Sequence, residues 1–348
     1  MKIAIISFSQ NGAALSGRIA AFLRKEAHTV TESVKSAHVE NSIEESVKAW
    51  TARQFQEQNA IIFIGAAGIA VRSVAPMTVS KCKDPAVLVI DEKGKFCIPI
   101  LSGHIGGANA LASKISDACS MQAVITTATD VQEKWAVDVF AVENQLQIKE
   151  LKKAKEISAR VLAGEKIRYF VEEKAVLGEK IPKELQLIDE EEARRNPPDI
   201  YTGIHMHPEW EETLCLVPKA VVIGIGCKKG TSMEKIEMTV REVLEQEGIC
   251  PDCLAEAASI DLKAEEQGLI EYCEKYHLDF HTYSSAELGE AEGDFTGSDF
   301  VKKITGVDNI CERSAICASK GGRLLSKKYA RDGVTAALAV KKWGVRFE

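Results

Sequence analysis

The feature that most constrains the fold of this chain is a recurring succession of a short apolar run, a glycine-rich turn and an amphipathic stretch. Residues 2–8 read as a buried strand and residues 12–26 as the helix that follows it, and residues 60–65 begin the next such succession. Later in the chain, a strand over residues 220–225 precedes a helix that Thr231 or Ser232 can cap and that runs to about residue 247. Strands and helices that alternate in this way favour a parallel sheet with helices packed on its faces. We therefore predict an α/β protein.

The alternation stops in the middle of the chain, where the sequence is rich in Lys and Glu and includes an acidic run at residues 189–192. Short strand-like runs, such as residues 167–171, occur within this segment. We predict two α/β domains with mainly parallel sheets, residues 1–134 and 218–348, joined by a small α+β middle domain, residues 135–217.

Three more elements follow from the same periodicities. We expect residues 123–127 to form the last strand of the N-terminal domain. In the C-terminal domain we expect a helix over residues 262–276 and a final helix that ends near residue 342.

Composition and charge exclude several classes of protein. The formal net charge of −7 lacks the basic excess on which general nucleic-acid binding depends. No apolar run reaches the roughly 20 residues that span a bilayer, and the N-terminus lacks the three regions of a signal peptide. We therefore expect a cytoplasmic protein that binds neither nucleic acid nor membrane. The sequence leaves the oligomeric state open, a homodimer included.

The ten cysteines are scattered along the chain, and Cys97 and Cys119 sit in apolar patterns typical of reduced core cysteines. Cys250 and Cys253 form the one close pair. A zinc site would need a second pair or histidines at suitable spacing, and the sequence offers neither. We therefore expect no metal site, with a metal or redox function of this pair as the minor alternative.

The most distinctive motif is Leu-Ser-Gly-His-Ile-Gly-Gly-Ala-Asn at residues 101–109, between a predicted strand and a predicted helix. Glycines let backbone N–H groups approach a ligand, and the N-terminus of a helix favours negative charge. His104 is suited to general-base catalysis near neutral pH. A purely structural turn is the alternative interpretation.

Further candidates lie at other turns. Gly65 and Gly68 join a strand to a helix that carries Arg72, in a turn that either binds an anion or only packs tightly. Thr127 and Asp130 follow the next strand, at an edge where open α/β sheets place ligands. A helix cap is the alternative role of Asp130.

Basic side chains occur in two places in the C-terminal domain. The loop at residues 224–230 carries Lys228 and Lys229, but Thr231 stands where a Walker loop requires Lys, so we do not predict a nucleotide site. Residues 313–331 include Lys320 and Arg323 and contain no acidic residue, which indicates either a solvated face or a patch for a polyanion.

Residues 64–72, 101–109 and 126–130 together resemble the amino-terminal domain of the CbiG family. Residues 219–343 resemble the CbiG carboxy-terminal domain, which also occurs alone as CobE; the matching motifs are residues 224–231 and the stretch around residues 257–269. The resemblance implies hydrolysis of cobalt-precorrin 5A in anaerobic cobalamin biosynthesis. Water opens a δ-lactone of the tetrapyrrole, and a two-carbon fragment leaves as acetaldehyde.

The resemblance also implies partners and cofactors. The cobalt belongs to the polycarboxylate substrate, so no cofactor is expected, and neighbouring enzymes of the pathway are candidate partners. A non-catalytic carrier of cobalt-corrinoid intermediates is the alternative function, and a nucleotide-dependent transferase is a third class that the failed Walker pattern disfavours.

Under this resemblance the candidate residues take definite roles. His104 would activate water, backbone N–H groups near Gly106 and Gly107 would hold the oxyanion, and Thr127 and Asp130 would orient groups or transfer protons. The expected substrate-binding residues are Gly65, Gly68, Arg72, Ser102, Gly103, Gly106, Gly107, Asn109, Lys228, Lys229, Lys320 and Arg323.

Overall fold

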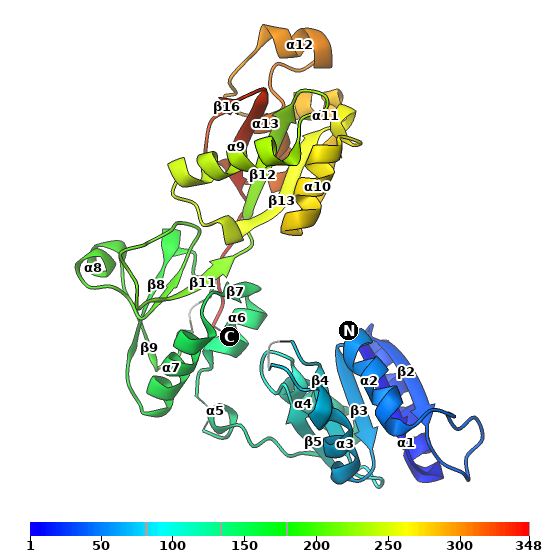
Figure 1. Ribbon diagram of the computed structural model, residues 1–348. Coiled ribbons are helices and arrows are strands. Elements are labelled where there is room, and N and C mark those ends of the chain that lie inside the picture. The colour runs from blue at the N-terminus through cyan, green and yellow to red at the C-terminus, as the bar shows by residue number, and fades with distance from the viewer. Residues whose placement is uncertain (81–82, 133, 179, 348) are drawn as a thin grey trace. The chain divides into compact units, whose positions relative to one another are not determined.

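The computed structural model describes residues 1–80, 83–132, 134–178 and 180–347, without the side chains of Asp130 and Lys174 (Figure 1). The chain forms two compact units, Met1–Val139 and Phe140–Glu348. Among the described helices, none is both long enough and apolar enough to cross a membrane.

The first unit is a six-stranded sheet in the order β2-β1-β3-β4-β5-β6. All neighbouring strands are parallel except β4 and β5, which are antiparallel. The strands are β1 (Lys2–Ser7), β2 (Thr29–Val34), β3 (Ala60–Ile64), β4 (Ala86–Ile90), β5 (Phe96–Leu101) and β6 (Gln122–Ala123). The helices are α1 (Gln10–Lys25), α2 (Val47–Glu57), α3 (Ala67–Val74), α4 (Ala108–Cys119), α5 (Ala128–Val131) and α6 (Val137–Glu143), with a 3-10 turn at Ala75–Met77; α6 continues into the second unit.

Helices cover both faces of this sheet because β3 and β4 are apolar and buried at every position and β1 is apolar from Ile3 to Ile6. Ile3 and Ile5 of β1 pack in one core layer with residues of α1 and α4. Ala4 and Ile6 pack in the opposite layer with Trp50 of α2. The two layers hold the strand ends, and therefore the loops after them, in fixed positions.

The second unit contains two sheets. The smaller has the order β7-β11-β10-β8-β9, with β7 antiparallel to β11 and the other pairs parallel. It consists of β7 (Leu146–Ile148), β8 (Ile167–Val171), β9 (Leu185–Leu187), β10 (Ile200–Thr202) and β11 (Leu214–Pro218), with helices α7 (Leu151–Leu162) and α8 (Glu190–Arg195) and a 3-10 turn at Glu172–Lys174.

The larger sheet has the order β14-β13-β12-β17-β15, and β16 also pairs with β17. Its strands are β12 (Val221–Cys227), β13 (Leu254–Ile260), β14 (Asp279–Tyr283), β15 (Arg323–Leu324), β16 (Tyr329–Arg331) and β17 (Val334–Val340). Its helices are α9 (Met233–Gln246), α10 (Gln267–Tyr276), α11 (Ser285–Glu290), α12 (Asp299–Thr305) and α13 (Cys311–Ser319), with 3-10 turns at Pro251–Cys253 and Asp261–Lys263.

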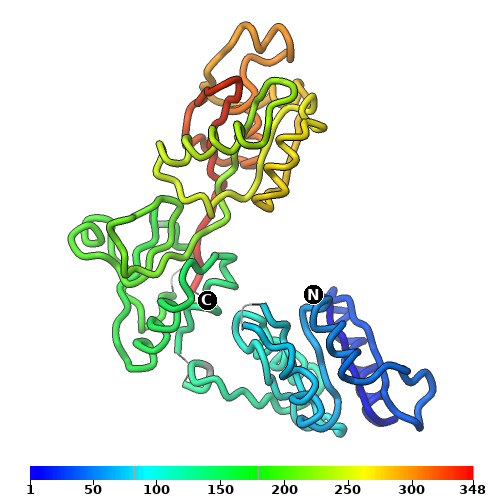
Figure 2. Tube along the Cα trace, in the orientation of Figure 1, coloured from blue at the N-terminus to red at the C-terminus, as the bar shows by residue number. Residues whose placement is uncertain are grey.

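The C-terminal segment links the two sheets of this unit. After β17 the chain runs back along the smaller sheet (Figure 2), where Val345 pairs with Val176. The ring of Phe347 then stacks on Phe140 with the ring centroids 4.9 Å apart.

The mixed α/β architecture is confirmed, two local predictions are wrong in whole or in large part, and a third is confirmed except at its start. The expected final helix is the strand β17, which pairs antiparallel with β12 along its whole length. Of the strand expected over residues 123–127, only Ala123 lies in the sheet. The helix expected over residues 262–276 is a 3-10 turn followed by α10, which begins at Gln267.

Candidate functional site

The loop between β5 and α4 folds back on itself. The amide of Gly107 donates to the carbonyl oxygen of His104 at 2.8 Å, and the amide of Ala108 donates to that of Ser102 at 3.1 Å. Ser102 and Gly107 adopt left-handed backbone conformations, with φ of 56° and 80°. A Cβ atom on Gly106 would lie 2.3 Å from the Cβ of Ser102, so the fold of the loop requires glycine at residue 106.

The imidazole of His104 has a polar partner at each ring nitrogen. Its Nδ1 lies 3.2 Å from Oδ2 of Asp138, at the start of α6. Its Nε2 lies 3.3 Å from the hydroxyl oxygen of Thr129, in α5. The side chains of His104 and Asp138 are 13% and 10% exposed, so the pair is largely shielded from water.

This arrangement assigns different tasks to the two ring nitrogens. A carboxylate only accepts hydrogen bonds, so Asp138 selects the tautomer with the proton on Nδ1. The lone pair of Nε2 is then directed toward the Thr129 hydroxyl and can accept a proton there. The two contacts therefore fix the orientation of the imidazole and favour one tautomer.

A second polar contact braces the same loop. The side-chain amide of Asn109 donates to the hydroxyl oxygen of Thr127 at 3.0 Å. Asn109 is buried, and a Cβ on Gly103 would lie 2.8 Å from its side-chain oxygen. The β5–α4 loop and the segment after β6 are thus held together, as their shared sheet edge predicts. The side chain of Asp130 lies outside the described part of the chain.

Sequence reasoning missed two members of this cluster, Thr129 and Asp138. Thr129 lies in the same hydroxyl-rich run as Thr127, but Thr129 is buried and its hydroxyl contacts the imidazole, whereas that of Thr127 contacts Asn109. Asp138 lies 34 residues beyond His104 in the chain, and only the tertiary fold brings the two together.

Gly65, Gly68 and Arg72 do not belong to this cluster. Because β5 runs antiparallel to β4, Leu101 lies beside Val87 at the start of β4, whereas the amide of Gly65 donates to Ile90 at its end. The two glycine-rich turns therefore lie at opposite edges of the sheet.

Arg72 lies at the edge of the sheet that carries Gly65 and Gly68. A Cβ atom on Gly68 would lie 3.4 Å from the guanidinium nitrogens of Arg72, so this side chain folds back over its own turn. Arg72 is thus placed with Gly65 and Gly68, away from His104.

The four basic candidates lie in the second unit and have different surroundings. Lys228 and Lys229 are exposed in the loop after β12. Lys228 lines a cavity of about 420 Å³ together with Lys328, Arg331 and Phe300.

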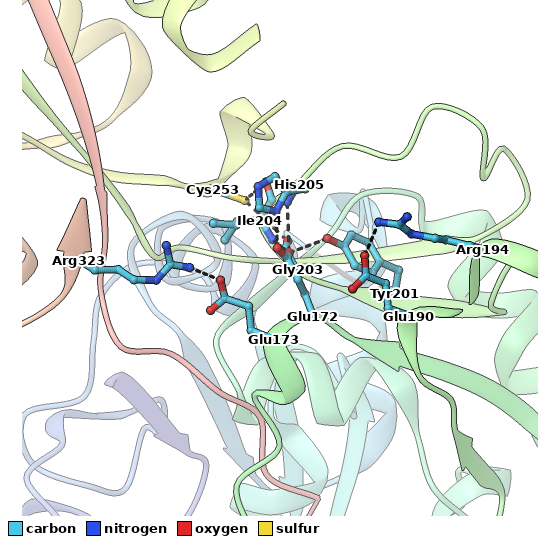
Figure 3. A network of polar contacts seen from close by, with 10 residues as sticks. All are labelled: Glu172, Glu173, Glu190, Arg194, Tyr201, Gly203, Ile204, His205, Cys253 and Arg323. Atoms are coloured by element: carbon cyan, nitrogen blue, oxygen red, sulfur yellow. Dashed lines mark hydrogen bonds and ion pairs between the residues drawn. The ribbon is translucent and has the colours of Figure 1, made fainter. Parts of the chain in front are cut away.

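The remaining two are not part of that cavity lining. Lys320 is exposed at the end of α13, in the left-handed conformation. Arg323 forms an ion pair with Glu173 from the other sheet of this unit (Figure 3). Arg323 therefore has a structural contact, in addition to the ligand contact that we predicted as one of two alternatives for this stretch.

Comparison with known proteins gives matches along nearly the whole chain. The family models described as cobalamin synthesis G N-terminal and C-terminus match residues 49–130 and 221–339. The cobalt-precorrin-5A hydrolase of Salmonella typhimurium is 34% identical, over 97% of both chains. That of Priestia megaterium is 30% identical, over 97% of this chain and 94% of its own. The crystal structure of a cobalamin biosynthesis protein G homolog from Sulfolobus solfataricus is 23% identical, covers 97% of each chain and superposes with a TM-score of 0.42.

Proposed function

The chain belongs to the CbiG family of cobalt-precorrin-5A hydrolases, and from that premise we propose that its β5–α4 loop activates the water of the reaction. The activity of the protein is hydrolysis of cobalt-precorrin 5A. Water adds to the lactone carbonyl and the acyl–oxygen bond breaks. The freed oxygen stays as a hydroxyl on the two-carbon fragment. This hydroxyl loses its proton and becomes a carbonyl as the carbon–carbon bond to the macrocycle breaks. The electron pair of that bond and a proton pass to the ring carbon, and the fragment leaves as acetaldehyde.

The single observation that carries the proposal is the double contact of His104. Lactone hydrolysis needs a base that removes a proton from water as the water attacks. Nε2 of His104 is that base, and a water molecule would take up the hydrogen-bonding position beside the Thr129 hydroxyl. Asp138 acts through the imidazole as a positioning residue, because it fixes the ring and stabilises the imidazolium that forms.

The oxyanion also needs donors, and the loop geometry narrows the choice. The amide of Gly107 already donates to His104 within the loop, and the amide of Asn109 donates to the carbonyl of Gly103 at 2.9 Å. The expected role of the Gly107 amide is therefore replaced by a structural one. The amide of Gly106 is the donor we assign to the oxyanion, beside the N-terminus of the twelve-residue helix α4.

The substrate is a polycarboxylate, which gives the basic side chains of the second unit a function. Lys228 and Lys229 are the binding residues we favour, because they are exposed and Lys228 borders a cavity that also exposes the ring of Phe300. The cobalt is bound in the substrate, so the proposed mechanism uses no cofactor held by the protein. Transfer of the substrate from neighbouring enzymes of the pathway stays a prediction, as does the formation of a homodimer.

The test is incubation of the purified protein with cobalt-precorrin 5A, with the released aldehyde trapped by a hydrazine and both products identified by mass spectrometry. We expect His104→Ala to lower the rate by about 10²–10⁴-fold, the usual contribution of a positioned base. His38→Ala is the matched control, because His38 is an exposed histidine of the same unit. A folded His104→Ala variant with unchanged rate would remove His104 from the mechanism, and tight binding without turnover by the wild type would indicate a carrier.

A further inference from the structure

The paired cysteines of the second unit lie at the two ends of one tight turn. The amide of Cys253 donates to the carbonyl oxygen of Cys250 at 2.9 Å, which closes the 3-10 turn Pro251–Cys253. A turn closed in this way brings the two Cα atoms within about 7 Å, and a disulfide accommodates Cα separations of about 4.4–6.8 Å. Both cysteines are free thiols. The backbone is therefore already close to the geometry of a Cys250–Cys253 disulfide.

The two sulfur atoms have different environments. The pKa of Cys250 is lowered to about 7, mainly by a hydrogen bond from the Cys253 thiol. A hydrogen bond from the Asp252 amide and the positive charge of Lys149 lower it further, and together these effects exceed the opposing effect of burial. The hydrogen bond to Cys250 and complete burial raise the pKa of Cys253. Lys149 is held in place by an ion pair with Asp252. Cys250, 8% exposed, is thus the nucleophilic thiol, and Cys253, fully buried, is the thiol that would resolve a mixed disulfide.

We infer that Cys250 and Cys253 form a redox-active dithiol that exchanges reversibly with small disulfide compounds, a site independent of the hydrolase mechanism. With glutathione disulfide, the Cys250 thiolate attacks one sulfur, forms a mixed disulfide and releases one glutathione thiolate. The Cys253 thiol then loses its proton and attacks the Cys250 sulfur, which releases the second glutathione. The protein is oxidised by two electrons, and one glutathione disulfide is reduced to two thiols.

A metal site fits these residues less well. In the described part of the chain, no three His, Cys, Asp or Glu side chains are grouped so that they could hold a metal ion. A structural zinc site takes four such ligands. Two thiols of unequal acidity in one turn are instead typical of thiol–disulfide exchange.

Cys253 also contacts the polar cluster around Glu172 in the smaller sheet (Figure 3). The Cys253 sulfur lies 3.6 Å from the carbonyl oxygen of Ile204, which also accepts the Cys250 amide at 2.8 Å. The amide of Ile204 in turn donates to Oε2 of Glu172 at 2.6 Å. Oxidation removes the S–H proton of Cys253 and with it the hydrogen bond to the carbonyl oxygen of Ile204. The redox state of the pair therefore changes the hydrogen bonding at Ile204, whose amide binds Glu172.

The first test measures the reaction of each cysteine in the full-length reduced protein with limiting iodoacetamide at pH 7, read by peptide mass spectrometry. Cys227 is the internal reference, because it is partly exposed and burial raises its pKa. We expect Cys250 to react about tenfold faster than Cys227, as thiolate fraction dominates the rate. An equal or slower rate at Cys250 would contradict the inference.

The second test equilibrates the protein in glutathione buffers, followed by acid quenching and mass spectrometry. The wild type should form the Cys250–Cys253 disulfide, reversibly and with loss of two hydrogens. Cys253→Ser should instead accumulate glutathione on Cys250, whereas Cys227→Ser should behave as wild type. The inference fails if both thiols stay reduced, if Cys250 pairs with Cys215, or if the wild type stops at the mixed disulfide.

Discussion

Nδ1 of His104 and Oδ2 of Asp138 lie 3.2 Å apart, although 34 residues separate them in the chain. The contact joins the loop after β5 to the first turn of α6. Because Oδ2 of Asp138 lies beside Nδ1, and Thr129 lies beside the other ring nitrogen, Asp138 favours the tautomer in which Nε2 can accept a proton.

Asp138→Asn should therefore lower kcat while leaving KM nearly unchanged. The amide has the shape of the carboxylate but can donate a hydrogen bond to Nδ1, which stabilises the wrong tautomer. We expect a loss of at least about tenfold, the lower range for disabling a positioned base. The measurement is steady-state kinetics together with thermal unfolding. Asp117→Asn, an exposed aspartate on α4, is the control; a rise in KM alone would assign Asp138 to binding instead.

The central motif of the site could be predicted from the sequence because it is local. A strand, a glycine-rich turn and a helix leave a clear pattern over residues 101–109, and the neighbouring threonines follow the next strand. The direction of β5 leaves no such pattern, because an apolar run reads the same in a parallel and an antiparallel pair. We predicted that Arg72 binds the substrate on which His104 acts, and the structure places the two residues at opposite edges of the sheet.

The strand β17 shows the same limit for secondary structure. Its sequence, Val-Thr-Ala-Ala-Leu-Ala-Val, contains alanines that favour a helix and β-branched residues that favour a strand. Pairing with β12 decides between the two, and pairing is a tertiary effect. Asp138 was missed for a related reason, since its partner is distant in sequence.

Gly106→Ala should destabilise the first unit more than Gly107→Ala. A Cβ on residue 106 would meet the Ser102 backbone oxygen at 2.8 Å and its Cβ at 2.3 Å, whereas a Cβ on residue 107 meets nothing within 4 Å. We expect about 2–3 kcal/mol for the first variant, as for overpacked sites, and about 1 kcal/mol for the second, from left-handed strain alone. Chemical denaturation of both variants measures the difference. The reverse order would show that the loop is looser than the structure indicates.

The double variant Lys228→Ala/Lys229→Ala should raise KM for cobalt-precorrin 5A by about threefold to tenfold at low salt, because each exposed cation contributes modestly. The increase should shrink as ionic strength rises, while kcat stays constant. Lys152→Ala/Lys155→Ala removes the same charge from the exposed face of α7 and serves as the control. Equal effects of the two double variants would indicate a response to net charge and not a binding site.

The pair of Glu172 and His205 should make the stability of the second unit depend on pH. Burial opposes the charge of Glu172, but hydrogen bonds from His205 and Tyr201 prevail and lower its pKa below the ordinary 4.5. The hydrogen bond with Glu172 raises the pKa of His205 above the ordinary 6.5. The stability from Glu172 is present above pH 4.5 and lost as the pH falls through its lowered value. That from His205 is complete below pH 6.5 and lost as the pH rises through its raised value. The pair therefore stabilises the second unit most between pH 4.5 and pH 6.5, where Glu172 is ionised and His205 is protonated.

His205→Asn tests this window, because the side-chain amide can still donate to Glu172 but does not titrate. At pH 6 we expect the wild type to unfold at most about 2–4 °C above the variant, since His205 is partly exposed and the ion pair is screened. By pH 9 the gap should narrow, as the histidine loses its proton. His277→Asn, at the exposed end of α10, should show no such pH-dependent gap. A gap that stays constant from pH 6 to pH 9 would mean that His205 contributes through packing alone and that its charge adds nothing.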